Sequence, residues 1–88
     1  MTIYERALAH YGAETQTLMM FEEMAELQKE LCKRSRGADN VDAIAEEIAD
    51  VEIVLEQMKI LHDCKSGVCY YKLLKLERLA DRMEMEGK

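Results

Sequence analysis

The sequence contains no proline and no tryptophan, and only four of its 88 residues are glycine. Small β-sandwiches and barrels need many tight turns, in which glycine and proline predominate, so this composition argues against both architectures. The chain is instead rich in alanine, leucine, glutamate, lysine and methionine, which have high helix propensities. Because 88 residues suffice for one small domain, we expect a single all-helical domain over residues 1–88.

Positive charge is also scarce, since 12 lysine and arginine residues face 18 acidic residues and leave a net charge of −6. Nucleic acid polymers are bound by basic surfaces that displace counterions, so we expect no nucleic acid partner. We find no secretory leader pattern and no apolar run long enough for a membrane span, so we expect no membrane partner. The cysteines, Cys32, Cys64 and Cys69, match no zinc or redox spacing, which favours a reduced, cytoplasmic protein. A bridge between Cys64 and Cys69 is the alternative.

Hydrophobic periodicity and capping residues predict four helices joined by short loops. Thr2 and Glu5 have the spacing of a capping box that opens the first helix, and Gly12 is expected to end it. Asn40 is the expected N-cap of the third helix. The second helix is expected to start at Thr15 or Thr17. The last three helices are expected to cover about 15–36, 41–62 and 68–86. Four such helices predict an antiparallel four-helix bundle.

Carboxylates interrupt the apolar stripes of the second and third predicted helices. Glu47 falls inside the stripe of the third helix and Asp50 lies one turn further along its edge, while Glu23 and Glu26 share one edge in the second helix. Charges at such positions are costly when they stay unpaired. If the two helices pack antiparallel, the four carboxylates converge and need protons or cations to compensate their charge, and a hard divalent cation is the economical solution. Mg²⁺ suits oxygen ligands and keeps positions for water and phosphate, with Mn²⁺ as the alternative ion.

These two acidic groups, written Glu22-Glu23-x-x-Glu26 and Glu47-x-x-Asp50, resemble the signature of the MazG-like all-α NTP pyrophosphohydrolases. The flanking residues agree, since the motifs read EEMAEL from position 22 and EEIADV from position 46. The resemblance covers about residues 12–82. It implies a helical-bundle fold assembled as a homodimer or a dimer of dimers. It also implies hydrolysis of a nucleoside triphosphate to the monophosphate and pyrophosphate, as in house-cleaning of the nucleotide pool.

Carried over to this chain, the family pattern makes Glu23, Glu26, Glu47 and Asp50 the metal ligands. Glu22 is the position that would orient or deprotonate water, and Glu22, Glu23 and Glu47 are the expected catalytic carboxylates. The expected substrate-binding residues are Gln16, which could reach a base or sugar, and four cations of the last helix that could clamp phosphates: Lys72, Lys75, Arg78 and Arg82. These cations could come from the same subunit or from a neighbour, and a solvated basic face is the alternative.

Two other interpretations remain open at the level of sequence. The short chain leaves little material for a lid over a substrate, which favours a non-catalytic nucleotide- or metal-binding module of the same fold. Alternatively, the chain is an unrelated helical bundle in which the glutamates are merely solvated and pair with neighbours one turn away.

Overall fold

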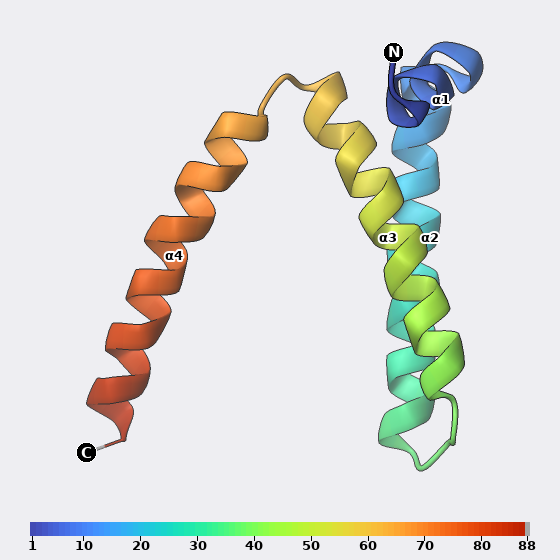
Figure 1. Cartoon of the computed structure of the whole chain (residues 1–88). Coiled ribbons are helices and arrows are strands. Elements are labelled where there is room, and N and C mark those ends of the chain that lie inside the picture. The colour runs from blue at the N-terminus through green and yellow to red at the C-terminus, as the bar shows by residue number, and fades with distance from the viewer. Residues whose placement is uncertain (88) are drawn as a thin grey trace.

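The computed structural model describes residues 1–87, so that Lys88, the last residue of the expected domain, lies outside it. The described residues form four helices and no strand, which confirms the all-helical prediction (Figure 1). The helices are α1 (Ile3–Tyr11), α2 (Ala13–Ser35), α3 (Val41–Leu61) and α4 (Lys65–Glu86). None of them, within this part of the chain, combines the length and hydrophobicity that a membrane span requires.

The start of α1 is fixed by the predicted capping box. The Thr2 hydroxyl accepts from the Glu5 backbone N–H at 3.1 Å, and the Glu5 carboxylate accepts from the Thr2 backbone N–H at 2.7 Å. Gly12 adopts a left-handed φ of 93° and ends α1, as predicted, but α2 begins at the next residue, ahead of the predicted threonines. The helix α4 also begins earlier than predicted, at Lys65. Gly67 lies in its first turn, where the backbone N–H groups have no partner within the helix, so the glycine does not prevent the helix from starting there.

Asn40 occupies the N-cap position of α3 but its side chain does not cap the helix. Its amide Nδ2 instead donates to the backbone oxygen of Glu30 at 3.0 Å and to the Glu30 carboxylate at 2.9 Å. Asn40 is therefore the N-cap residue by position, as predicted, although its side chain makes no capping hydrogen bond. The amide ties the start of α3 to the last turns of α2, and so helps to fix how the two helices lie against each other.

The helices α2 and α3 pack antiparallel along a seam with the spacing of a coiled coil. The less exposed side chains recur at alternating intervals of three and four residues, at Gln16, Met20, Glu23, Leu27 and Glu30 in α2 and at Ile44, Glu47, Val51, Val54 and Met58 in α3. Gln16 and Gln57 meet at one end of the seam over 2.6 Å, and the Asn40–Glu30 contact closes the other end. The seam thus contains carboxylates at positions that a coiled coil normally fills with leucine.

The two sides of this helix pair differ in chemistry. In an antiparallel helix pair, the residue directly after each seam position lies on one side of the pair, for both helices. The residue directly before each seam position lies on the other side. The first side carries apolar side chains, which we call the α2–α3 apolar face: Phe21, Met24, Leu31, Val41 and Ile48. The second side carries acidic side chains: Glu22, Glu26, Glu46 and Asp50.

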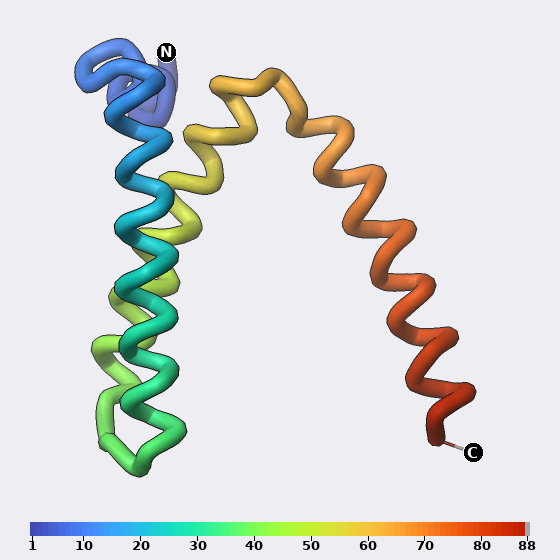
Figure 2. Tube along the Cα trace, turned by 180° about the vertical axis from the view of Figure 1, so that it is seen from behind, coloured from blue at the N-terminus to red at the C-terminus, as the bar shows by residue number. Residues whose placement is uncertain are grey.

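The helix α4 leaves the rest of the molecule after a short turn. The helix α1 packs across α3 and α2, whereas α4 touches α3 near their junction and makes no packing contact with α2 (Figures 1 and 2). The four helices therefore do not close into a bundle within one chain. Among the apolar side chains of residues 1–87, only Met20 and Val54 are buried, which leaves most of the hydrophobic surface uncovered.

Candidate metal centre

Three of the four predicted ligands meet where the acidic side of the helix pair reaches the seam. One carboxylate oxygen from each of Glu23, Glu47 and Asp50 lies within 4.8 Å of the others. The antiparallel packing places Glu23 of α2 opposite Asp50 of α3, and Glu47 lies one turn before Asp50 on the same helix. All three side chains are partly buried, and none of them takes part in the ion pairs found among the described residues.

The charges in this cluster destabilise one another. Burial, followed by the charge of Asp50 and a hydrogen bond between the two carboxyls, raises the pKa of Glu23. Burial, followed by the charges of Asp50 and Glu26, raises the pKa of Glu47. The Oε2 atom of Glu47 is buried and has no hydrogen-bond partner among the described residues. A buried carboxylate oxygen without a partner is the feature that a proton or a cation would satisfy.

Neighbouring glutamates on the same helices show the contrast. Glu30 lies on the seam as well, but hydrogen bonds from Asn40 and Lys33 lower its pKa. Glu56 pairs with Lys59 at 2.8 Å, and this hydrogen bond lowers its pKa. Among the described residues, the chain therefore supplies partners to these two carboxylates and none to the buried oxygen of Glu47.

The remaining predicted carboxylates lie beside the cluster. Glu26, the predicted fourth ligand, is exposed, and the structure does not bring it within the group of three, although its charge acts on Glu47. Glu22, the predicted water-orienting residue, is also exposed, and its charge contributes to the raised pKa of Glu23. Both side chains are exposed and lie near enough to the cluster for their charges to act on it.

The structure does not bring the predicted phosphate-binding cations to this cluster within one chain. Lys75, Arg78 and Arg82 are exposed on α4, which makes no packing contact with α2. Lys72 lies closer to the body of the molecule and lines a hollow of about 530 Å³ with Tyr4, Glu52 and Lys59. None of the three clustered carboxylates lines that hollow, so Lys72 is also separate from them.

Gln16, the predicted contact to a base or sugar, is engaged in the seam. Its side chain is 5% exposed and its Nε2 donates to the Oε1 of Gln57, which is 4% exposed. In this chain Gln16 thus holds α2 against α3. Gln57 was not predicted as the partner of Gln16, although the sequence places a second glutamine on the facing helix.

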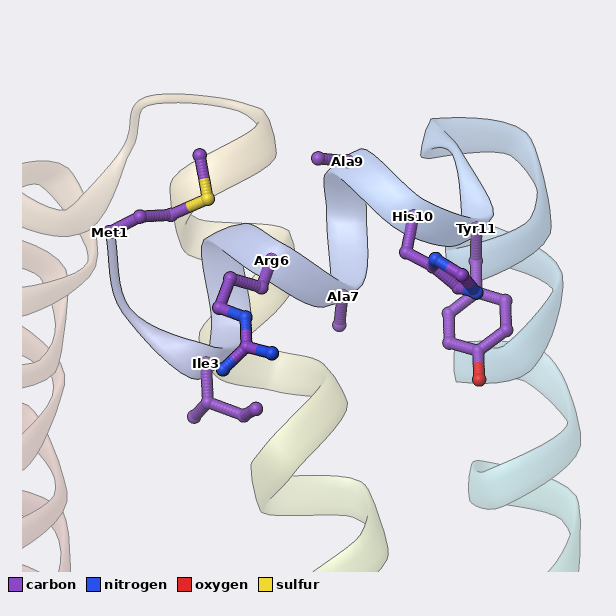
Figure 3. A pocket seen from close by; sticks show the side chains of 7 residues that line it. All are labelled: Met1, Ile3, Arg6, Ala7, Ala9, His10 and Tyr11. Carbon is purple, nitrogen blue, oxygen red and sulfur yellow. The ribbon is translucent and has the colours of Figure 1, made fainter.

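Another hollow lies away from the carboxylates. It measures about 550 Å³ and follows the outer surface of α1, where Met1, Ile3, Arg6 and His10 are among its lining residues (Figure 3). His10 and Tyr11 contact each other edge to face, with ring centroids 4.6 Å apart. The hollow is open and shares no residue with the acidic cluster, so it does not extend the candidate site.

Cys32, Cys64 and Cys69 are all free and exposed, so the structure contains no bridge between Cys64 and Cys69. Comparison of the chain with protein-family models, with curated proteins and with solved structures gave no match. The likeness to MazG-like enzymes therefore rests on the two acidic motifs, and the geometry of Glu23, Glu47 and Asp50 must be judged on its own chemistry.

Proposed function

We propose that this chain is a Mg²⁺-dependent nucleoside triphosphate pyrophosphohydrolase that converts (d)NTPs to (d)NMPs and pyrophosphate. The observation that carries the proposal is the group of three carboxylates on the α2–α3 seam, one of which has a buried oxygen without a partner. Oxygen donors at this separation suit a hard divalent cation, with Mn²⁺ as the alternative. The order and spacing of the acidic motifs support the same reading.

In this proposal Glu23, Glu47 and Asp50 hold the ion, and Glu26 joins them by a change of side-chain rotamer. When bound, such an ion neutralises phosphate oxygens and lowers the pKa of a coordinated water. Glu22 borders the cluster from the solvent side, where its carboxylate can accept a hydrogen bond from the attacking water and orient it. No nucleophilic side chain is needed, because positioning and electrostatic stabilisation supply most of the rate acceleration in phosphoryl chemistry.

The proposal includes self-association as a homodimer or a dimer of dimers and a cytoplasmic location. One chain leaves Lys75, Arg78 and Arg82 away from the carboxylates, so a second chain is the available source of cations for the phosphates. The free cysteines suit a reducing compartment. House-cleaning of the nucleotide pool is the role that this activity would serve.

The test is release of pyrophosphate from a panel of NTPs and dNTPs with and without Mg²⁺. Glu47→Gln keeps the shape of the side chain and removes its charge, and we expect it to abolish activity. Glu46→Gln makes the same change at the adjacent, exposed position and should retain activity. Equal activity in both variants would exclude a metal-binding role for Glu47.

A second candidate is a non-catalytic module that binds a nucleotide or a metal ion. The separation of the α4 cations from the carboxylates favours it, because α4 makes no packing contact with α2 in a single chain. Calorimetry distinguishes the two candidates. Nucleotide binding without turnover in Mg²⁺ or Mn²⁺ would support the module, and turnover would support the enzyme.

A further inference from the structure

We propose that two copies of this chain exchange their α4 helices, so that α4 of each copy covers the α2–α3 apolar face of the other. The inference deepens the proposed self-association and does not depend on the proposed hydrolysis. It specifies which surfaces meet and which chain supplies each of them.

The surface of the chain is too large for a compact monomer. It exposes 7075 Å², whereas a compact folded protein of 10.2 kDa exposes roughly 5,300 Å². Its radius of gyration is 16.4 Å, against about 12 Å for a compact chain of this length. The excess surface, roughly 1,800 Å², exceeds the ~800 Å² that each partner buries in a standard interface. The chain therefore has the area for a stable dimer.

Two apolar surfaces without a partner account for much of this excess. The residues of the α2–α3 apolar face are between 42% and 61% exposed. Two residues of this face, Met24 and Leu31, also line a largely apolar groove of about 460 Å³. Leu27 and Val51 of the seam line the same groove. On α4, the apolar stripe is between 42% and 69% exposed and consists of Leu73, Leu76, Leu79 and Met83.

The dimensions of the two surfaces match. The helix α4 has 22 residues and α2 has 23, so both are roughly 33–35 Å long. One helix can therefore cover the whole length of the other, and a reciprocal exchange satisfies both surfaces in a two-fold dimer.

The turn before α4 holds this helix away from the α2–α3 pair of its own chain. The helix that covers the α2–α3 apolar face is therefore expected to come from a second copy. The backbone N–H groups of His62, Asp63 and Cys64 all donate to carbonyls at the end of α3, with Asp63 in the left-handed region at a φ of 48°. The turn is thus fully hydrogen-bonded, and it directs α4 away from the helix pair (Figure 2). The first turns of α4 contact α3, and Lys72 lines a hollow together with Tyr4 of α1.

The first test changes the apolar stripe of α4 and measures the dissociation constant by analytical ultracentrifugation. We expect the wild-type chain to be a dimer, and Leu73→Gln with Leu76→Gln to weaken it at least ~100-fold, because each dimer loses burial of four leucines. The matched control, Glu77→Gln with Glu84→Gln, also introduces two glutamines into α4, but in place of glutamates. It should leave the dimer intact. A monomeric wild-type chain, or a dimer that the leucine variant does not weaken, would overturn the proposal.

The second test identifies the chain that supplies α4, and does not depend on the stability of the leucine variant. Cys32 lines the apolar groove and is exposed. One tagged chain keeps Cys32 alone, and a second, differently tagged chain has no native cysteine and carries Leu73→Cys, Leu76→Cys or Ala80→Cys. We expect oxidation of the mixed sample to join the two chains at one of these positions. Bridges that form only when both cysteines are placed in the same chain would overturn the exchange, even if the chain dimerises.

Discussion

The buried amide pair of Gln16 and Gln57 permits a quantitative test of the α2–α3 seam. The two side chains are 5% and 4% exposed, and their hydrogen bond spans 2.6 Å. Replacement of Gln16 alone by leucine leaves the amide of Gln57 buried and unpaired. Replacement of both by leucine turns this end of the seam into an apolar layer beside Met20 and Val54.

An unsatisfied buried amide costs about 1–3 kcal/mol, whereas removal of both partners in favour of apolar groups is close to neutral. We therefore expect Gln16→Leu and Gln57→Leu each to lower the free energy of unfolding by about 1–3 kcal/mol, and the double variant to recover most of this loss. In a domain of this size, each kcal/mol corresponds to roughly 4–8 °C in Tm.

Urea denaturation followed by circular dichroism measures these differences. All variants are compared at one protein concentration, because self-association makes stability depend on concentration. If the double variant loses the sum of the two single losses, the amides are not coupled across the seam. The antiparallel register that places Glu23 opposite Asp50 would then be wrong as well.

Three further predictions concern charge and helix ends. The fold raises the pKa of Glu23 and Glu47 above 4.5, so the folded chain binds protons at these groups more tightly than the unfolded chain does. In metal-free buffer, the free energy of unfolding should therefore fall as pH rises from 4.5 through the raised pKa values. Thermal melts across this range check the slope, which Glu47→Gln should reduce. Asn40→Asp removes both donors to Glu30 and adds a like charge, so its Tm should fall below that of the control Asp39→Asn. Thr2→Ala should weaken α1 by about 1 kcal/mol, seen as faster amide hydrogen exchange in that helix without a change in α3.

Local sequence signals predicted the helices better than their packing. The capping box of Thr2 and the left-handed turn of Gly12 depend only on near neighbours, and both are present in the structure. Asn40 occupies the predicted N-cap position, but its amide contacts Glu30, ten positions earlier in the chain, and helix-capping preferences contain no information about such a contact. The predicted range of the last helix started after Gly67, whereas α4 includes this glycine in its first turn, where the backbone N–H groups have no partner within the helix.

The candidate site was predictable to the extent that it depends on helical periodicity. Glu47 interrupts an apolar stripe, so the sequence alone places it against another helix. The exclusion of Glu26 from the cluster depends on the exact rotation of α2, which a helical wheel does not fix. Similarly, the periodicity of α4 places its apolar residues on one stripe, but it cannot say which surface covers that stripe.

Titration of Mg²⁺ into the metal-free protein, followed by calorimetry and by Tm, tests most directly whether Glu23, Glu47 and Asp50 form a cation site. Binding to the folded state alone stabilises it, by about 2.7 kcal/mol at an ion concentration one hundred times Kd. We expect the wild-type chain and Glu46→Gln to bind the ion and melt at higher temperature, and Glu47→Gln to do neither. Absence of binding to the wild-type chain, or equal binding by Glu47→Gln, would contradict a metal centre on the α2–α3 seam.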